Sequence, residues 1–183
     1  MKVGKFLLAF VFSLIFMAQS CFANDAALLA DMRYNPQNYI ANGGAGSGLS
    51  LWIFKPSLNV ERYAPPKYII SIKRVIYSHQ GIKENGEWKT YINADWHGVK
   101  RYLYNYDEMK IYVEERDSQN WQELDLKRGT AVGSTNPYAQ DLEAAEFAFY
   151  FAYKKSFFDN PLSFSLKKYI ETGELNTFRN EQK

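Results

Sequence analysis

Two histidines and a nearby aspartate are the residues of this sequence with the clearest capacity for acid–base chemistry. His79 and His97 are the only histidines, and both are predicted to lie in loops. Two histidines are too few for a histidine-only catalytic metal site, and neither has the i, i+4 partner of a zinc-binding helix. Asp95 and His97 could supply two thirds of a catalytic triad, but no serine lies in a nucleophile-elbow pattern. Local hydrogen bonds within a turn are the favoured interpretation, and no metal ion or cofactor is expected.

Glu143 and Glu146 form the second candidate, because residues three apart on a helix can bring two carboxylates together. Hydrolases with paired acids use such carboxylates for proton transfer. A solvated helix edge explains the same spacing, with Glu146 and Tyr150 leading to Lys154. The solvated edge is the favoured interpretation. A secreted hydrolase that uses these acids or the Asp–His pair remains the alternative.

Aromatic side chains form the third candidate, and they suggest binding rather than catalysis. Flat rings exposed in or beside loops can stack on sugars or on an aromatic or proline-rich peptide. The predicted ligand-binding residues are Trp88, Tyr91, Trp96, His97 and Trp121. Most aromatic residues of such a domain belong to its core.

The glycines from Gly43 to Gly48 raise the question of a phosphate-binding loop. They lack the Lys-Ser/Thr ending of a nucleoside-triphosphate loop and the spacing of a dinucleotide loop, and a strand rather than a helix follows. A flexible connector without regular structure is the favoured interpretation.

The central element that would position these candidates is a predicted hairpin from Val99 to Val113. Period-two alternation predicts two strands joined near Asp107 and Glu108. With a loop of two or four residues, the pairs on one face are Tyr102–Val113, Tyr104–Ile111 and Tyr106–Met109. The other face then pairs Arg101 with Glu114, an independent charge match. A loop of three residues would exchange the two faces.

Further strands are predicted at 49–55, 68–78, 88–92 and 120–126. Pro56 is expected to end the first of them, and Pro65–Pro66 to form an extended, unpaired entry into the second. Asn85–Gly86 is the strongest hairpin-turn signal in the chain. Residues 94–98 are predicted to connect the third of these segments, 88–92, to the central hairpin.

A helix is predicted from Pro137 to about Tyr153, capped by Ser134, Thr135 or Asn136. The face predicted to pack on the sheet carries Tyr138, Leu142, Ala145, Phe149, Ala152 and Tyr153. Phe147 and Phe151 lie on another side. We expect Leu162, Phe164 and Leu166 to cover them; otherwise they form an exposed patch for interaction or self-association.

The first 23 residues have the layout of a secretory signal peptide. Lys2 and Lys5 precede an uncharged apolar run from Phe6 to Met17 that is too short to span a bilayer comfortably. Cleavage after Ala23 is expected. Cys21 suggests lipid attachment as an alternative, although the residues before it lack the usual upstream leucine. No transmembrane segment is expected after cleavage.

Removal of residues 1–23 leaves one expected globular domain, 24–183, with a core over about 47–170 and a polar tail after Gly173. The chain has 22 Lys and Arg against 20 Asp and Glu, and the signal takes two lysines, so the expected mature net charge is zero. This balance gives no indication of nucleic-acid binding. The only cysteine leaves with the signal, so stability must come from packing.

These elements predict an α+β fold: a curved antiparallel sheet of about five or six strands, packed on one face by a C-terminal amphipathic helix. The order of features resembles the surface-adhesin protein E type of exported bacterial domain. The matching features, over roughly residues 47 to 153, are Trp52, the strand from Tyr68 to Ser78, Arg101 to Tyr106, Trp121 with Leu124, Gly133–Ser134 and the closing helix. Domains of that type often carry a cysteine pair, which the expected mature chain lacks.

The phrases RYAPPKY and EFAFYFAY are more similar to secreted proteins of anaerobic bacteria. The resemblance implies an antiparallel sheet packed by a helix and a role in envelope or surface attachment, and it implies no catalytic residue. We therefore expect an exported, non-enzymatic domain, periplasmic, on the cell surface or extracellular, that binds a protein, peptide or glycan. A self-associating structural envelope protein is the remaining alternative.

Overall fold

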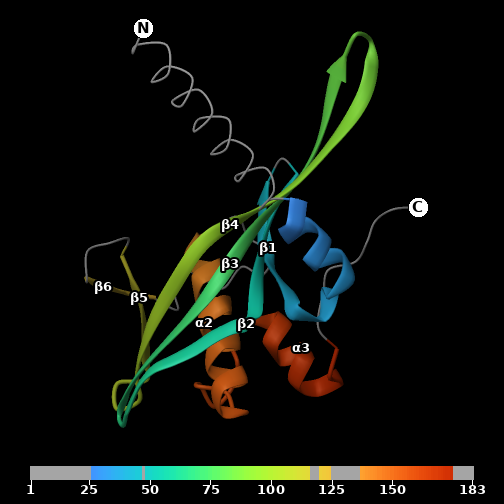
Figure 1. Cartoon of the computed structure of the whole chain (residues 1–183). Coiled ribbons are helices and arrows are strands. Elements are labelled where there is room, and N and C mark those ends of the chain that lie inside the picture. Colours follow the sequence, from blue (N-terminus) through green and yellow to red (C-terminus); the bar gives the residue numbers. More distant parts are fainter. Residues whose placement is uncertain (1–25, 47, 116–119, 125–136, 175–183) are drawn as a thin grey trace, which may run out of the picture.

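The fold is a single curved antiparallel sheet with helices on both of its faces (Figure 1). The computed structural model describes residues 26–46, 48–115, 120–124 and 137–174. Six strands follow one another in the order β1-β2-β3-β4-β5-β6, so each strand pairs with its neighbours in the sequence. The prediction of an α+β fold with a curved sheet of five or six strands is confirmed.

The strands are β1 (Tyr39–Gly46), β2 (Leu49–Ala64), β3 (Lys67–Glu84), β4 (Glu87–Asn105), β5 (Lys110–Glu114) and β6 (Trp121–Glu123). The helices are the 3-10 turn η1 (Pro36–Asn38), α2 (Pro137–Tyr153) and α3 (Phe164–Thr172). Residues 26–34 are also helical. The predicted bounds of α2 are confirmed.

The central hairpin has the predicted register. Tyr102 pairs with Val113 and Tyr104 with Ile111, across a four-residue turn from Tyr106 to Met109. On the opposite face the Arg101 guanidinium contacts the Glu114 carboxylate, and it also lies 2.7 Å from Glu61 of β2. The alternation and the charge pair therefore identified the same two faces.

Two predicted breaks in the sheet, the glycine-rich segment and Pro56, are instead part of it. Gly43, Gly44 and Gly46 belong to β1, the outer strand, which pairs with β2 through two register shifts. Pro56 lies within β2, in an irregular stretch where Ser57 Oγ accepts a hydrogen bond of 2.7 Å from the Lys73 N–H. This side-chain acceptor satisfies the β3 donor, so β2 continues beyond the proline.

Pro65–Pro66 is the two-residue loop between Ala64 and Lys67, which pair as the ends of β2 and β3, so the expected extended entry is wrong. Residues 94–98 belong to the long strand β4 and are not a connector. There Arg74 of β3 pairs with Gly98 while Val75 pairs with Trp96, which leaves His97 as the extra residue of a bulge. Both histidines are therefore on strands, contrary to the loop prediction.

The main core lies between the sheet and α2. Tyr102 and Tyr104 are fully buried on this face, with Leu142, Ala145 and Phe149 of the helix. The Tyr104 hydroxyl donates a hydrogen bond of 2.7 Å to the Ala145 carbonyl. The helix face predicted to pack on the sheet is thus the one that does so.

A second core covers the opposite face of the sheet. Leu28 and Met32 of the helical residues 26–34 pack on Tyr39, Val75 and Ala94. Val75 alternates with Ile72 and Ile76 along β3 and therefore points to the face opposite α2. The sheet is therefore buried on both faces near its middle.

The aromatic residues on the other side of α2 do not form an exposed patch. Phe147 is fully buried, and Phe151 is half-buried with its ring centroid 6.0 Å from that of Tyr169 in α3. Leu162 and Leu166 join the same core, as expected, whereas Phe164 is 61% exposed and does not cover them. The predicted signal peptide, the predicted caps at 134–136 and most of the polar tail lie outside the described residues.

The hydroxyl of Tyr104 should contribute measurably to stability. We expect Tyr104→Phe to lower the free energy of unfolding by about 1 kcal/mol, because it removes a buried hydrogen bond between the sheet and α2. Urea denaturation measures the change. Tyr106→Phe, at a partly exposed turn residue, is the matched control and should change stability by less than about 0.5 kcal/mol. Equal losses in both variants would contradict this role.

Candidate functional site

The hairpin of β3 and β4 extends beyond the rest of the sheet as a two-stranded arm, residues 80–91 (Figure 1). Strand β2 accompanies β3 only as far as the pair Leu49–Ser78, where the His79 N–H donates to the Gly48 carbonyl at 2.8 Å. Further along, β3 and β4 pair only with each other among the described strands. Both edges of the arm therefore present unpaired backbone groups.

The turn at the end of the arm is the one that the sequence predicted. Glu84 pairs with Glu87 across Asn85 and Gly86, which have φ values of 51° and 89°. Positive φ at both central residues is typical of the type I′ turn that matches the twist of a two-residue hairpin. The sequence of the turn itself therefore favours the hairpin of the arm. A pair of strands on its own, however, is only marginally stable in water.

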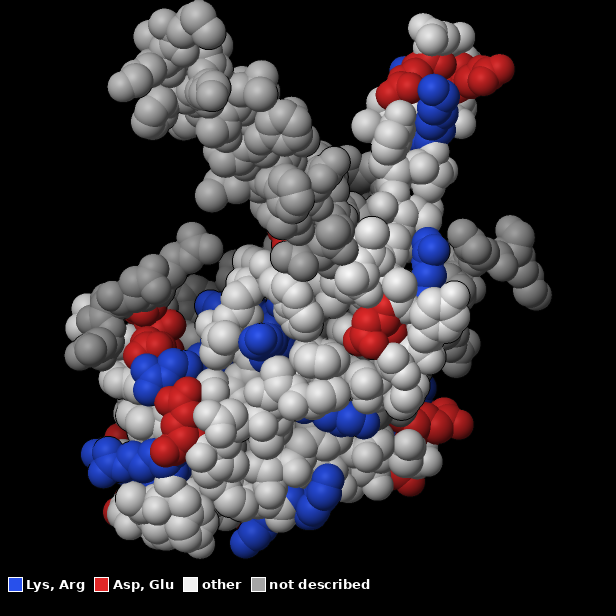
Figure 2. Space-filling view, viewed as in Figure 1, with Lys and Arg blue, Asp and Glu red and all other residues white. Residues whose placement is uncertain are grey.

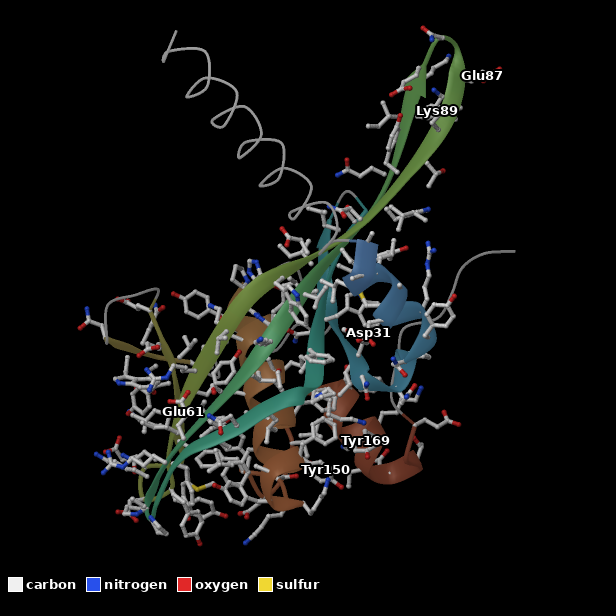
Figure 3. All side chains as sticks on the ribbon, in the orientation of Figure 1. Asp31, Glu61, Glu87, Lys89, Tyr150 and Tyr169 are labelled. Carbon is white, nitrogen blue, oxygen red and sulfur yellow. The ribbon has the colours of Figure 1, made fainter. Side chains whose placement is uncertain are left out.

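Exposed apolar side chains occupy both faces of the arm. Trp88 is 74% exposed, and its ring leans over Gly81, where a Cβ atom would lie 3.6 Å from Trp88 Cε3. Tyr91 and Ile82 are exposed on the opposite face. Figure 3 shows the labelled Glu87 and Lys89 on the arm, at a distance from the body of the domain.

Charged groups hold the outer part of the arm together. Glu84 accepts hydrogen bonds from Lys89 Nζ at 2.9 Å and from the Tyr91 hydroxyl at 2.7 Å. On the face shown in Figure 2, acidic and basic side chains are interspersed at the arm and over the body. The arm is therefore distinguished from the rest of the surface by its exposed apolar side chains rather than by its net charge.

The predicted binding residues do not form one groove. Trp88 and Tyr91 lie on the arm but on opposite faces, and Trp96 lies eight residues along β4 from Trp88, at the base of the arm. The Trp96 ring packs edge-on against Phe54 at 5.3 Å and lies 5.4 Å from Lys73 Nζ. Trp121 is on β6, with the Arg101 guanidinium 5.8 Å from its ring.

A charged cavity of about 300 Å³ lies near the base of the arm, beside the start of α2. Asp141 of α2 is nearly buried there and lies 2.9 Å from Arg74 Nη1 and 3.5 Å from Lys100 Nζ. The Tyr102 hydroxyl is 3.4 Å from the same carboxylate. His97 lines this cavity and also a neighbouring surface cavity of about 570 Å³ that contains Lys100 and Arg101.

Sequence reasoning did not identify this ion cluster. Arg74 occupies a period-two position between Ile72 and Ile76, so a charged residue within an apolar face was the available signal. Asp141 lies near the N-terminal end of α2, where the helix dipole alone would explain an acidic residue. Their pairing joins β3 to α2, and no local pattern indicates such a contact.

Glu146 of α2 is buried and Glu143 is partly buried, so the solvated-edge interpretation is wrong for Glu146. Glu146 is 1% exposed and accepts hydrogen bonds from the backbone N–H groups of Leu162 at 2.8 Å and Ser163 at 2.6 Å. Ser163 caps α3 by accepting from the Leu166 N–H. Glu143 accepts from the Ser163 hydroxyl at 3.2 Å. The acids therefore hold α3 against α2.

Burial raises the pKa of Glu146 to about 7, and the nearby Glu143 adds to the rise, while the two backbone N–H groups oppose it. A carboxyl with this pKa could transfer protons at neutral pH. However, both of its oxygens bind backbone groups in the interior. Its position favours a structural role.

No group of three potential metal ligands occurs among the described residues. Within the same part of the chain, no helix is long and apolar enough to cross a bilayer. Comparison with known protein families, with curated protein sequences and with solved structures finds no significant match.

Glu146 should make stability depend on pH. Its pKa of about 7 in the folded protein lies above the value of 4.5 expected in the unfolded chain. The stabilisation from this group is therefore complete below about pH 4.5 and is lost as the pH rises through 7. We expect Glu146 to account for a fall of up to about 3 kcal/mol in unfolding free energy between pH 5 and 8.

Urea denaturation across this pH range measures the effect. Glu146→Gln should flatten the profile, since an amide does not titrate, whereas Glu87→Gln at the exposed end of the arm should leave it unchanged. An unaltered slope in Glu146→Gln would contradict the assignment.

Proposed function

We propose that the protein is an exported, non-enzymatic binding domain that uses the arm to engage a partner protein at the cell envelope. The observation that carries this proposal is the exposure of Trp88 on a ribbon that extends beyond the body of the domain. A tryptophan exposed on one side and supported by a glycine on the other is already ordered for contact. Tryptophan is enriched among the residues that dominate binding energy at protein interfaces.

The free edges of the arm favour a protein as the partner. A row of unpaired backbone N–H and C=O groups can accept an additional strand, and side chains such as Trp88 and Tyr91 then provide specificity. A glycan is less well matched by this surface. Trp88 and Trp96 are about 27 Å apart along the strand, at 3.4 Å per residue, and Trp96 is packed against Phe54.

Two further observations favour binding over hydrolysis. Glu146, one of the paired acids of α2, lies in the interior and accepts hydrogen bonds from backbone groups of the segment that leads into α3. Asp95 and His97 are strand residues of β4, and His97 is the bulge. Export rests on the signal-like pattern of residues 1–23, and fractionation of native cells tests it. Recovery of the protein in the cytoplasm would overturn this part of the proposal.

Photo-crosslinking in native cells tests the role of the arm. A photoreactive residue at Lys83, which pairs with Trp88 on the arm, should give a discrete adduct with one other protein. The same group at the exposed Lys168 of α3 should not give that adduct. Trp88→Ala should weaken binding of the purified partner by roughly thirtyfold, the loss expected for a tryptophan at the centre of an interface.

Thermal unfolding provides the control for folding. Trp88→Ala should leave the melting temperature nearly unchanged, whereas Trp96→Ala should lower it, because Trp96 packs against Phe54. An adduct that contains two copies of this chain would favour the self-associating alternative and overturn the partner proposal. An adduct that persists in Trp88→Ala would also overturn it.

A further inference from the structure

The cavity beside the start of α2 carries an excess of positive charge. Arg74 and Lys100 line it and share a single carboxylate, Asp141. The first turn of α2 also contributes to its wall, through Pro137 and Gln140, and the N-terminal end of a helix has a positive potential. The cavity can therefore accept one further negative charge.

Arg74, which lines the cavity, has a buried donor without a partner. The side chain is 4% exposed, and its Nη1 lies 2.9 Å from Asp141. Its Nε–H has no hydrogen-bond partner among the described residues. A buried donor without a partner destabilises the folded protein. A carboxylate oxygen that reaches this guanidinium would form a charge-assisted hydrogen bond with it.

The Asp141 carboxylate does not prevent a second carboxylate from binding. One of its oxygens faces Arg74 and the other faces Lys100, so both are directed to cations. The excess of a single positive charge matches a monoanion, whereas a phosphate dianion would leave a net negative charge beside Asp141.

The rest of the wall selects for an apolar body. Leu51 of β2, Ile76 of β3 and Pro137 of α2 line the same space as Arg74 and Lys100. A volume of about 300 Å³ is at the lower end of the range for small-molecule sites. A ligand that fills it needs an acidic end and a small hydrocarbon end.

We propose that this cavity binds a small monocarboxylate with an apolar body, of about the size of benzoate. The carboxylate contacts Arg74 and Lys100, and the apolar body lies against Leu51 and Ile76. This site is separate from the arm, so its failure and the failure of the proposed function are distinguishable.

Titration calorimetry on the full mature chain tests the site. Benzoate should bind saturably at one molecule per chain. Benzylamine, which has the same ring and the opposite charge, should not bind, and inorganic phosphate should bind at least tenfold more weakly than benzoate. Equal heats from benzoate and benzylamine, or tighter binding of phosphate, would overturn the proposal.

Two variants test separately the positive charge of the cavity and its volume. Lys100→Gln should weaken benzoate binding at least tenfold, while Lys89→Gln, a matched change on the arm, should have no effect. Ile76→Phe should weaken benzoate binding by narrowing the cavity without altering its charge. Circular dichroism confirms that each variant is folded. Unchanged benzoate affinity in folded Lys100→Gln or in folded Ile76→Phe would overturn the proposal.

Discussion

The contact between two tyrosines of β4 and the helix α2 is the interaction on which the rest of the structure depends. Tyr102 and Tyr104 are fully buried at the centre of the sheet, and the Tyr104 hydroxyl bonds to the Ala145 carbonyl. Their hydroxyls are directed to the helix, one toward Asp141 and one toward a backbone carbonyl. The contact therefore fixes both the distance between the layers and the rotation of the helix. Arg74 and Glu146 reach their partners only because α2 is held in this orientation.

The bulge at His97 allows the long strand β4 to contribute side chains to both cores, one on each face of the sheet. On the side of the bulge toward the central hairpin, Lys100 and Tyr102 face α2; on the other side, Ala94 and Trp96 pair with the residues of β3 that face the second core. A bulge inserts one residue and so changes which side chains point to each face. The charged cavity lies where this change occurs. His97 thus separates the part of β4 that packs on α2 from the part that passes through the second core and continues into the arm.

Sequence reasoning succeeded where two independent signals agreed. The alternation of tyrosines and the pair Arg101–Glu114 gave one register for the central hairpin, and Asn85–Gly86 gave the end of the arm. It failed where the outcome depends on a distant partner. Pro56 remains within a strand because Ser57 accepts a hydrogen bond from β3. Glu146 is buried because the backbone of Leu162 and Ser163 returns to it.

For the candidate site, the residue types predicted that aromatic side chains are exposed, but not which of them also pack against a distant strand. Trp88, Tyr91 and Trp96 are all exposed as expected, but Trp96 also packs against Phe54, across strands that are not adjacent in the sheet. The ion pair of Arg74 with Asp141 has no local signature, because its members lie on a strand and a helix far apart in the chain. Its location follows only from the packing of the two layers.

The outer strands of the sheet determine where another polypeptide chain could join it. Strand β1 is interrupted by two register shifts and is rich in glycine, and β6 has only three residues. Short or irregular outer strands are poor templates for intermolecular pairing. Among the described strands, the long regular edges that remain free are those of the arm and the adjoining part of β4. Pairing with other chains is thus disfavoured at β1 and β6. The edges of the arm are the part of the sheet best able to pair with a strand of another chain.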